Sequence, residues 1–256
     1  MSNFVDLNSD MGEGFGAYTM GLDSNLLDFV TSANIACGWH AGDGLIMDRT
    51  VEEAITKGVG VGAHPGYPDL LAFGRRKIDI TDKEARAYML YQVGALSAFA
   101  KAHGGKLQHM KLHGAFYNTA CVDETLAGAI VDALYEFDPE IIVMALSGSV
   151  LLDLAEKKGM KVAHEVFADR GYNEDATLVN RKLPGAMIHD PKQAIERVKR
   201  MVLENKVETV TGSVIPIKAD SICVHGDNPE AVAFVETIRR ELEHSGIQVK
   251  PLHQFL

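Results

Sequence analysis

The sequence predicts an α/β fold in which seven or eight mainly parallel strands close into an irregular barrel. Short β-like runs alternate with longer amphipathic helical stretches along the 256 residues, and such alternation is typical of a parallel sheet. Seven or eight strand–helix units in a chain of this length favour a closed barrel. Six predicted strands also end in polar residues, which is where α/β barrels carry their active sites.

The expected elements follow from these runs in chain order. Strands are expected at 4–8, 32–37, 59–64, 108–113, 141–145, 161–167 and 221–225, with a weak eighth at 247–250. Helices are expected near 44–57, 82–103, 123–137, 148–158, 191–205 and 229–245. Several have start signals: Thr81 before Asp82 and Glu84, Asp190-Pro191, and Asn228-Pro229. Gly104, Gly159 and Gly246 stand where helices should end.

The chain is expected to form a single barrel domain over 1–256, because neither a linker nor a repeat divides it. The stretch 206–220 (KVETVTGSVIPIKAD) breaks the alternation of strands and helices. We interpret it as a small hairpin inserted before the last strong strand.

Composition and charge exclude several classes of function. Asp and Glu number 35 against 25 Lys and Arg, for a net charge of −10. Lysine and arginine form no stripe, so binding to nucleic acid or to an anionic membrane is disfavoured. The sequence contains no apolar run of about 18 residues, and we expect neither a membrane span nor a secretory signal. Three cysteines lie far apart, and we expect a cytoplasmic protein.

The strand ends are the most informative part of the sequence. The chain turns abruptly polar at FVDLNSDMGEG, ANIACGWHAGD, VGVGAHPGYPD, HMKLHGAFYN, EVFADRGY and SICVHGD. Successive side chains of a strand point to opposite faces. The inward face is therefore expected to carry Asp6, Asn8 and Asp10, then His109, Lys111 and His113, then Ser221, Cys223 and His225. The sequence thus predicts one polar pocket at the carboxyl ends of the strands.

Each of these residues also has a purely structural interpretation. His40, His64, His113 and His225 could each be a hydrogen-bonded core histidine, although four at equivalent strand ends favour a site. Asp10 and Glu13 could cap the first helix, as Asp227 could cap the last. Asp169 and Arg170 could form a structural ion pair, and Lys111 could pair with an acid for stability alone.

A metal site is permitted by the sequence but not required by it. His109 and His113 have the i, i+4 spacing of some helical zinc sites. In a strand, however, four residues span about 13 Å, so the two rings could not bind one ion. A metal would need ligands from different strands, such as Asp10, His40 and His64.

Common nucleotide and hydrolase motifs are missing from the sequence. It has neither a G-x-x-x-x-G-K-[ST] phosphate loop nor a G-x-S-x-G elbow. We interpret the glycine-rich segments GEGFG and GVGVGAHPG as loops whose backbone lies close to a ligand.

Six motifs together resemble one known family. DLNSDMGEGFG, NIACGWHAGD, GAHPGYPD with GRR, KLHGAFYN, EVFADRGY and ADSICVHGD resemble the LamB/YcsF family, the A subunits of bacterial 5-oxoprolinase. The resemblance runs from residue 3 to about residue 255 in the same order. Trp39 stands where the family often has Phe, and Phe116 where Leu is common. Neither departure affects a catalytic residue type.

The resemblance implies a fold, a reaction and partners. The fold would be an irregular TIM-like barrel of the glycoside hydrolase/deacetylase type. The reaction would be ATP-dependent hydrolysis of 5-oxo-L-proline to L-glutamate, with ATP (and Mg²⁺) cleaved to ADP and phosphate. ATP would be bound with help from the separate subunits B and C, and homo-oligomerisation is left open.

The residues suit this chemistry. Water attack on an activated lactam needs a base, for which Asp10, His64 or His113 is suitable. It needs cations against phosphate and developing negative charge, for which Lys111 and Arg170 beside Asp169 are placed. Arg75 or Arg76 could hold the substrate carboxylate. The remaining candidates for substrate binding are Asn8, Glu13, His40, Asn118, His225 and Asp227.

Two alternatives stay open. One is a metal-dependent, deacetylase-like hydrolase that acts on an N-acylated sugar, for which the Asp and His set is also suitable. The other is a non-catalytic subunit whose pocket presents the substrate to its partners.

Overall fold

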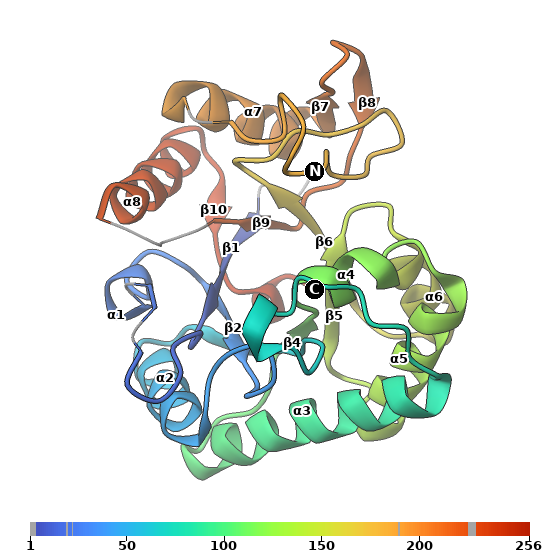
Figure 1. Cartoon of the computed structure of the whole chain (residues 1–256). Helices are drawn as coiled ribbons and strands as arrows, with labels where there is room; N and C mark the ends of the chain where they lie inside the picture. Colours follow the sequence, from blue (N-terminus) through green and yellow to red (C-terminus); the bar gives the residue numbers. More distant parts are fainter. Residues whose placement is uncertain (1–3, 19, 22, 189, 225–228) are drawn as a thin grey trace.

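The computed structural model describes residues 4–18, 20–21, 23–188, 190–224 and 229–256. Within these residues, seven parallel strands close into a barrel, because β1 pairs with both β2 and β9. They follow one another around the barrel in chain order (Figure 1): β1 (Phe4–Met11), β2 (Ser32–Ala36), β3 (Gly60–His64), β4 (His109–Lys111), β5 (Ile142–Leu146), β6 (Val162–Phe167) and β9 (Ser221–Cys223). The predicted α/β barrel is confirmed.

Closure of the barrel is irregular at β1. The weak eighth strand of the prediction is the two-residue β10 (Gln248–Val249), which pairs in parallel with Phe4 and Val5 at the start of β1. β1 pairs with β9 from Asp6 onward and with β2 from Asn8 onward. The β10 pairing thus precedes the pairings that close the ring.

Helices cover the outside of the barrel (Figure 1). They are α1 (Asp23–Leu26), α2 (Gly44–Thr56), α3 (Asp82–Ala102), α4 (Gly114–Ala120), α5 (Glu124–Phe137), α6 (Val150–Lys158), α7 (Pro191–Glu204) and α8 (Pro229–His244). The six longer ones match the predicted helices, whereas α1 and α4 are too short to show a helical period in the sequence. Across the described ranges, we find no helix long and apolar enough to cross a bilayer.

The start and stop signals at Thr81, Asp190 and Gly159 work as the sequence indicates, whereas Asn228, the predicted cap of α8, lies outside the described residues. Thr81 caps α3 in a capping box: its hydroxyl accepts from the Glu84 N–H, and the Glu84 carboxylate accepts from the Thr81 N–H. Asp190 caps α7 before Pro191. Gly159 ends α6 with φ = 87°, a left-handed conformation that glycine adopts without strain.

A hairpin follows α7. β7 (Lys206–Glu208) and β8 (Val214–Pro216) pair antiparallel, outside the barrel sheet. A cavity of about 610 Å³ lies between this hairpin and α7. Asp10, Lys111, His40, His64 and His113 do not line it.

Two short 3-10 helices complete the described elements, η1 (Leu70–Ala72) and η2 (Leu252–Gln254). η2 closes the amino end of the barrel, because Leu252 packs in a small apolar cluster with Ile142, Met144 and Ala163. The His253 ring also contacts Gln108 Oε1 at 2.6 Å. The amino end is therefore sealed, and the polar interior is left to face the carboxyl end.

Strand alternation separates an apolar layer from a polar interior. Val5, Leu7, Met110 and Ile222 are fully buried in the main core, whereas their neighbours along the strands are polar and equally buried. The polar side chains pair with one another across the barrel, as buried polar groups must. This is the arrangement that the sequence predicts for β1, β4 and β9.

Asp6 joins three strands inside the barrel. Its Oδ1 accepts hydrogen bonds from the hydroxyls of Thr31 (2.6 Å) and Ser32 (2.7 Å), and its Oδ2 accepts one from Ser221 (2.5 Å). Burial raises the pKa of Asp6 to about 6, against the opposing effect of these three donors. Asp6 thus links β1, where the barrel closes, to its neighbours on both sides.

Two glycines of GVGVGAHPG have a different role from the predicted one. Gly60 and Gly62 lie inside β3 rather than in a ligand-binding loop. A Cβ on Gly62 would lie 2.0 Å from the His109 Nε2, and one on Gly60 would lie 2.3 Å from the Gln108 Nε2. These glycines therefore make room for β4 side chains in the barrel interior.

Candidate active site

The carboxyl ends of the strands bring acid, base and cationic side chains to one end of the barrel. Asp10 lies near the end of β1, His64 ends β3, and Lys111 ends β4. His113 stands directly before α4, and Glu165 lies in β6. In a barrel of parallel strands, these positions all open on the same mouth.

Lys111 is at the centre of the group. Its Nζ lies 2.7 Å from Glu165 Oε1 and 3.0 Å from Asp10 Oδ1, and it donates to Asn8 Oδ1 at 3.1 Å. Burial alone would lower the pKa of Lys111, but the two carboxylates raise it well above its usual value. The ammonium is therefore a fixed positive charge, and its side chain is 4% exposed.

Glu165 is a site residue that the sequence interpretation missed. It is fully buried, and its second oxygen accepts a hydrogen bond from the Tyr117 hydroxyl at 2.7 Å. The signal available in the sequence was a glutamate in the middle of the largely apolar strand VAHEVF. Such a residue is seldom buried without a partner, and here the partner is Lys111.

Asp10 is the part of this charged group that faces the mouth. Its side chain is 21% exposed, and its Oδ2 lies 3.3 Å from the His64 Nε2. Burial would raise the pKa of Asp10, but His64 and Lys111 outweigh that effect and hold it well below its usual value. Asp10 is therefore ionised at neutral pH.

Asn34 and His109 hold Asp10 in position from the interior of the barrel. The Asn34 amide donates to Asp10 Oδ1 (2.9 Å) and to Asn8 Oδ1 (2.8 Å). Its oxygen must then accept from the His109 Nε2, which lies 2.7 Å away. Burial lowers the pKa of His109 to about 3, so that this ring is neutral. His109 supports the site and is not a ligand beside His113, as the strand spacing predicts.

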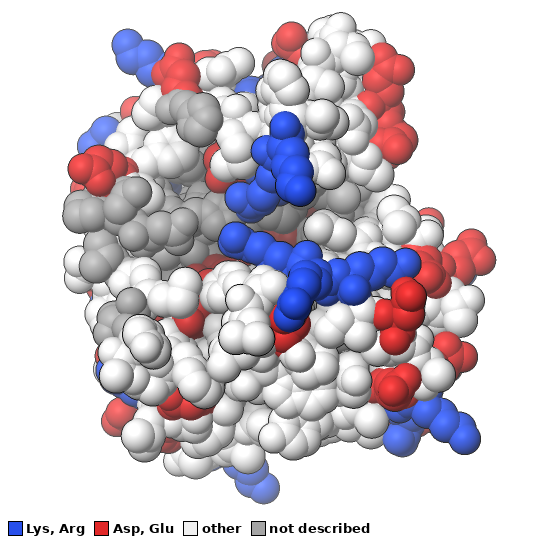
Figure 2. All heavy atoms as spheres, viewed as in Figure 1, with Lys and Arg blue, Asp and Glu red and all other residues white. Residues whose placement is uncertain are grey.

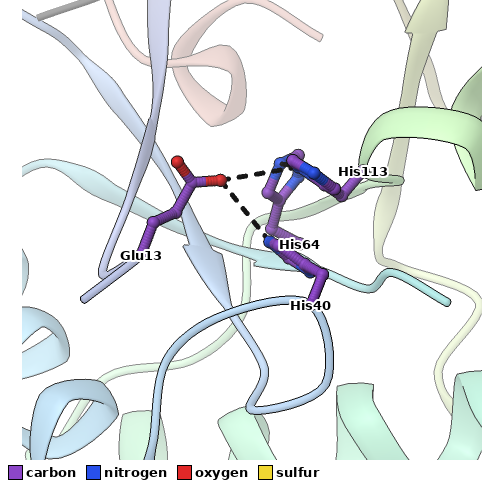
Figure 3. A group of neighbouring side chains, drawn as sticks. All are labelled: Glu13, His40, His64 and His113. Atoms are coloured by element: carbon purple, nitrogen blue, oxygen red, sulfur yellow. Dashed lines mark hydrogen bonds and ion pairs between the residues drawn. The ribbon is translucent and has the colours of Figure 1, made fainter. Parts of the chain in front are cut away.

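A second cluster lies next to Asp10 and consists of Glu13, His40, His64 and His113 (Figure 3). One ligand atom from each residue lies within 4.8 Å of the others. The Glu13 Oε1 lies 3.4 Å from the His40 Nε2 and 3.5 Å from the His113 Nδ1. The rings of His40 and His113 stack with their centroids 3.7 Å apart.

Burial favours the neutral form of two histidines of this cluster, His40 and His113. It lowers the pKa of His40 well below its usual value and that of His113 to about 3. A neutral imidazole and an ionised carboxylate are the forms that bind metal ions. The metal candidates from the sequence were Asp10, His40 and His64. The structure adds Glu13 and His113 to the two histidines, and it leaves Asp10 beside them in contact with His64.

The wall behind these rings is built from the segment after η1. Phe73 has φ = 54° and its carbonyl oxygen lies 2.9 Å from the His113 Nε2. Gly74 has φ = 62°, and a Cβ there would lie 2.8 Å from the His113 ring and 2.9 Å from the His40 Cβ. Only glycine leaves both stacked rings in place.

The structure places the other predicted substrate-binding residues in different surroundings. Arg75 is exposed, packs over the Phe73 ring at 5.1 Å, and lies near enough to help lower the pKa of His113. Arg76 instead pairs with Asp69, on the loop before η1. Asn118 is exposed on α4. Asn8 lies in the interior beneath Asp10, in contact with Lys111.

Arg170 and Asp169 follow β6 on a long loop. Arg170 donates to the carbonyl oxygens of Val179 (2.7 Å) and Ala186 (3.3 Å), so its guanidinium ties this loop to itself. The Asp169 carbonyl accepts from the Ile188 N–H at 2.8 Å. These contacts give Arg170 a structural role through backbone carbonyls, which differs from the ion pair with Asp169 that the sequence left open. His225 and Asp227 lie outside the described residues.

The mouth has a cationic rim. Figure 2 shows lysine and arginine side chains gathered over the middle of the face seen in Figure 1. Two exposed arginines act on residues that follow the barrel strands. Arg75 is close to His113, and Arg181 is close enough to Arg170 to lower the pKa of that guanidinium, after the larger effect of burial. On a chain with a net charge of −10, such a rim favours an anionic ligand.

Comparisons with known proteins agree over the whole chain. The chain is 61% identical over 256 residues to the A subunit of 5-oxoprolinase from Fusobacterium nucleatum, with 100% of both chains covered. It is 56% identical over 252 residues to that of Thermococcus onnurineus, covering 98% of this chain and 99% of the relative. A crystal structure of a lactam utilization protein from Thermus thermophilus superposes with a TM-score of 0.91 at 44% identity, covering 96% and 99%.

A family model settles the classification. The model of the LamB/YcsF family matches residues 5–256, which include Asp10, Lys111 and the Glu13–histidine cluster. The match agrees with the resemblance drawn from the six motifs, and the full-length identities support it independently. The chain belongs to the LamB/YcsF family.

Proposed function

We propose that this chain is the A subunit of an ATP-dependent 5-oxoprolinase, which hydrolyses 5-oxo-L-proline to L-glutamate while ATP is cleaved to ADP and phosphate. The observation that carries the proposal is full-length identity of 61% to a protein named as the A subunit of 5-oxoprolinase. The solved structure named a lactam utilization protein supports a lactam as the substrate. 5-Oxo-L-proline is a five-membered lactam with a free carboxylate.

The chemistry explains the use of ATP. A lactam carbonyl is a poor electrophile, and transfer of the γ-phosphoryl group to its oxygen makes the ring carbon reactive. Water then adds to that carbon, the C–N bond breaks, and the ring nitrogen takes up a proton. A second water releases phosphate from the resulting acyl phosphate. The products are L-glutamate, ADP and phosphate.

Asp10 is suited to the water attack. It is ionised and is the part of the Asp10–Lys111–Glu165 group most exposed to the mouth, at 21% of its side chain. A carboxylate with a low pKa is a weak base, but an activated carbon needs only a weak one. Lys111 behind it supplies a fixed positive charge, which offsets negative charge that develops on the substrate.

The cationic rim suits the anionic ends of the substrate. Arg75 extends from the segment that also positions His113. Its planar guanidinium can bind the substrate carboxylate through two hydrogen bonds. We assign it this role in preference to Arg76, whose guanidinium is already paired with Asp69.

Partners and ATP belong to the same proposal. The relatives are named as one subunit of an enzyme, which supports a complex with other subunits. We take these partners to be subunits B and C. The sequence has no phosphate loop of the G-x-x-x-x-G-K-[ST] type, so we assign ATP and its Mg²⁺ at least in part to those partners. We place the complex in the cytoplasm, in agreement with three buried, unpaired cysteines.

One observation favours a second candidate. The Glu13–histidine cluster is also suited to a metal-dependent hydrolase that removes an acyl group from an N-acylated sugar. Such an enzyme would need neither ATP nor partner subunits, and the same assay separates the two functions.

The test is a hydrolysis assay on the purified chain, alone and mixed with the partner subunits, with and without ATP. We expect glutamate from 5-oxo-L-proline only when the partners and ATP are both present, and little or none from the isolated chain. Glutamate formation without ATP, or deacetylation of an N-acetylated sugar by the chain alone, would refute the proposal.

A further inference from the structure

Two backbone carbonyls fix the tautomers of His64 and His113. The His64 Nδ1 lies 2.8 Å from the carbonyl oxygen of Lys111, and the His113 Nε2 lies 2.9 Å from that of Phe73. A carbonyl oxygen can only accept, so each of these nitrogens carries the hydrogen. In the neutral rings, the His64 Nε2 and the His113 Nδ1 therefore carry lone pairs.

These two lone pairs point at each other. The His64 Nε2 and His113 Nδ1 are 3.0 Å apart, and in these tautomers neither nitrogen carries a hydrogen that the pair could share. The Asp10 Oδ2 lies 3.3 Å from the first nitrogen and the Glu13 Oε1 lies 3.5 Å from the second. Lys111 contacts only the Asp10 end of this largely buried group, and a cation bound between the two rings would stabilise the remaining acceptors.

The surroundings of His40 also indicate a bound group in this cluster. It is fully buried, and neither of its ring nitrogens makes a hydrogen bond to any residue that the structure describes. Its Nε2 faces the Glu13 Oε1 at 3.4 Å (Figure 3). A buried imidazole without hydrogen bonds is costly unless something else satisfies it.

We propose that Glu13, His40, His64 and His113 bind one divalent transition-metal ion, such as Zn²⁺. Metal–nitrogen bonds of about 2.0–2.1 Å place neighbouring ligand atoms about 2.9–3.4 Å apart for angles between 90° and tetrahedral. Three separations among the cluster's atoms, 3.0, 3.4 and 3.5 Å, are at or just above that range, and the others lie within 4.8 Å. The stacked rings of His40 and His113 would tilt apart when both bind the ion. Three imidazoles and one carboxylate favour Zn²⁺ over Mg²⁺, which prefers oxygen ligands.

The carbonyls of Lys111 and Phe73 would then be the groups that orient two ligands. Metal-binding histidines usually donate their second N–H to a carbonyl or carboxylate, which holds the ring and its tautomer. Asp10 would stand beside the ion through its contact with His64. A bound cation would supply Lewis-acid polarisation of a substrate oxygen at the mouth. Ion binding by this cluster does not depend on which reaction the chain performs.

The test is calorimetric titration of Zn²⁺ into the full chain after chelator treatment, with metal content measured on the untreated protein. We expect one Zn²⁺ per chain and at least about 100-fold weaker binding of Mg²⁺. His113→Asn and Glu13→Gln should each weaken Zn²⁺ binding by at least about 100-fold, since changes to orienting groups alone cost about 10- to 100-fold. His103→Gln is the matched control, because His103 pairs with Asp48 outside the cluster.

Folding is followed separately by circular dichroism of the metal-free forms. If His113→Asn does not fold, Glu13→Gln remains informative, because that side chain is 18% exposed on a loop. Absence of Zn²⁺ binding by the wild-type chain would overturn the proposal, as would equal binding by wild type and Glu13→Gln. A single proton shared by His64 and His113 at neutral pH, seen by NMR in protein that takes up no Zn²⁺, would show what replaces the ion. Failure of the hydrolysis assay would count against the proposed reaction alone.

Discussion

Lys111 is held between two carboxylates, so its removal leaves one of them buried without its cation. In Lys111→Met, Glu165 keeps only the Tyr117 hydroxyl among its described partners, because its other contact is with Lys111. We expect a loss of about 3 kcal/mol in the free energy of unfolding, the usual cost of breaking a buried ion pair. Urea unfolding of the purified chain measures it.

A double variant separates charge balance from catalysis. Lys111→Met with Glu165→Gln removes both charges and should recover most of the lost stability, because no carboxylate is then buried without its cation. Turnover of the assembled complex should stay low, by about 10²-fold, since the fixed positive charge is still missing. A double variant with normal turnover would show that Lys111 has only a structural role.

Asp10 is expected to act on the substrate directly. Asp10→Asn keeps an oxygen that can accept from Asn34 and Lys111, and it removes the negative charge. Turnover of the complex should fall by about 10²-fold or more, a typical contribution of a general base, while the melting temperature changes little. Turnover within about threefold of wild type would transfer the role of base to another group.

From the sequence one could predict which strand and which face carry these residues, but not which partners they have in other strands. Alternation along β1 and β4 correctly placed Asp10 and Lys111 on the inward face, since that inference needs only a period of two. Glu165 escaped notice because its significance depends on Lys111, 54 residues away in a different strand. The tautomers of the histidines depend on backbone carbonyls, whose direction only the folded chain defines.

At the scale of elements, Gly62 is needed because β4 places an imidazole against β3. We expect Gly62→Ala to destabilise the protein by about 3 kcal/mol, the upper range for an overpacked core, because the His109 ring is held by Asn34 and Gln108 and cannot move aside easily. Gly128→Ala on α5, where a Cβ meets nothing within 4 Å, is the matched control and should be neutral or stabilising. Equal effects in thermal melting would contradict this account of β3.

Asp6 should make the stability of the barrel depend on pH. Its pKa is about 6 in the folded chain against an ordinary value of 3.8, so the folded state binds the extra proton between these values. Stability from this group is therefore highest at low pH and is lost as pH rises from about 4 to 6, by about 3 kcal/mol. In Asp6→Asn that loss should be missing, so the variant gains on the wild type across this window. Parallel pH profiles of unfolding free energy would contradict the assignment.

Most elements were predictable, and the exceptions have physical reasons. Long helices such as α3 and α5 can be predicted from their hydrophobic periodicity and capping residues, because both signals lie within the helix's own stretch of sequence. α1 and α4 are one or two turns long and depend on their surroundings. The glycines of β3 were interpreted wrongly because the close approach that requires them comes from the next strand. That the chain forms a single domain stays a prediction.

At the scale of the whole molecule, the charge at the mouth of the barrel is opposite in sign to the net charge of the chain. The chain carries −10 overall, and yet cations gather over the mouth (Figure 2). Distant acidic charges are screened within about 8–10 Å at moderate salt, so a ligand at the mouth is affected mainly by the nearby rim. An anionic substrate should therefore be attracted locally by a protein that repels it at long range in low salt.

Arg75 is the rim residue that we expect to hold the substrate carboxylate, and the prediction rests on the proposed function. In the assembled complex, Arg75→Ala should raise the KM for 5-oxo-L-proline by about 5- to 10-fold, since a charge-assisted hydrogen bond at a partly exposed position contributes about 1 kcal/mol. The kcat should change less, because Arg75 stands at the rim while Asp10 and Lys111 lie within the barrel.

Arg86→Ala is the matched control, because Arg86 pairs with Glu136 on the helical surface. Steady-state kinetics at low and high salt should show the wild-type KM rising with salt more steeply than that of Arg75→Ala. A normal KM in Arg75→Ala together with a raised KM in Arg76→Ala would reassign the carboxylate to Arg76, and its ion pair with Asp69 would then have to open when substrate binds.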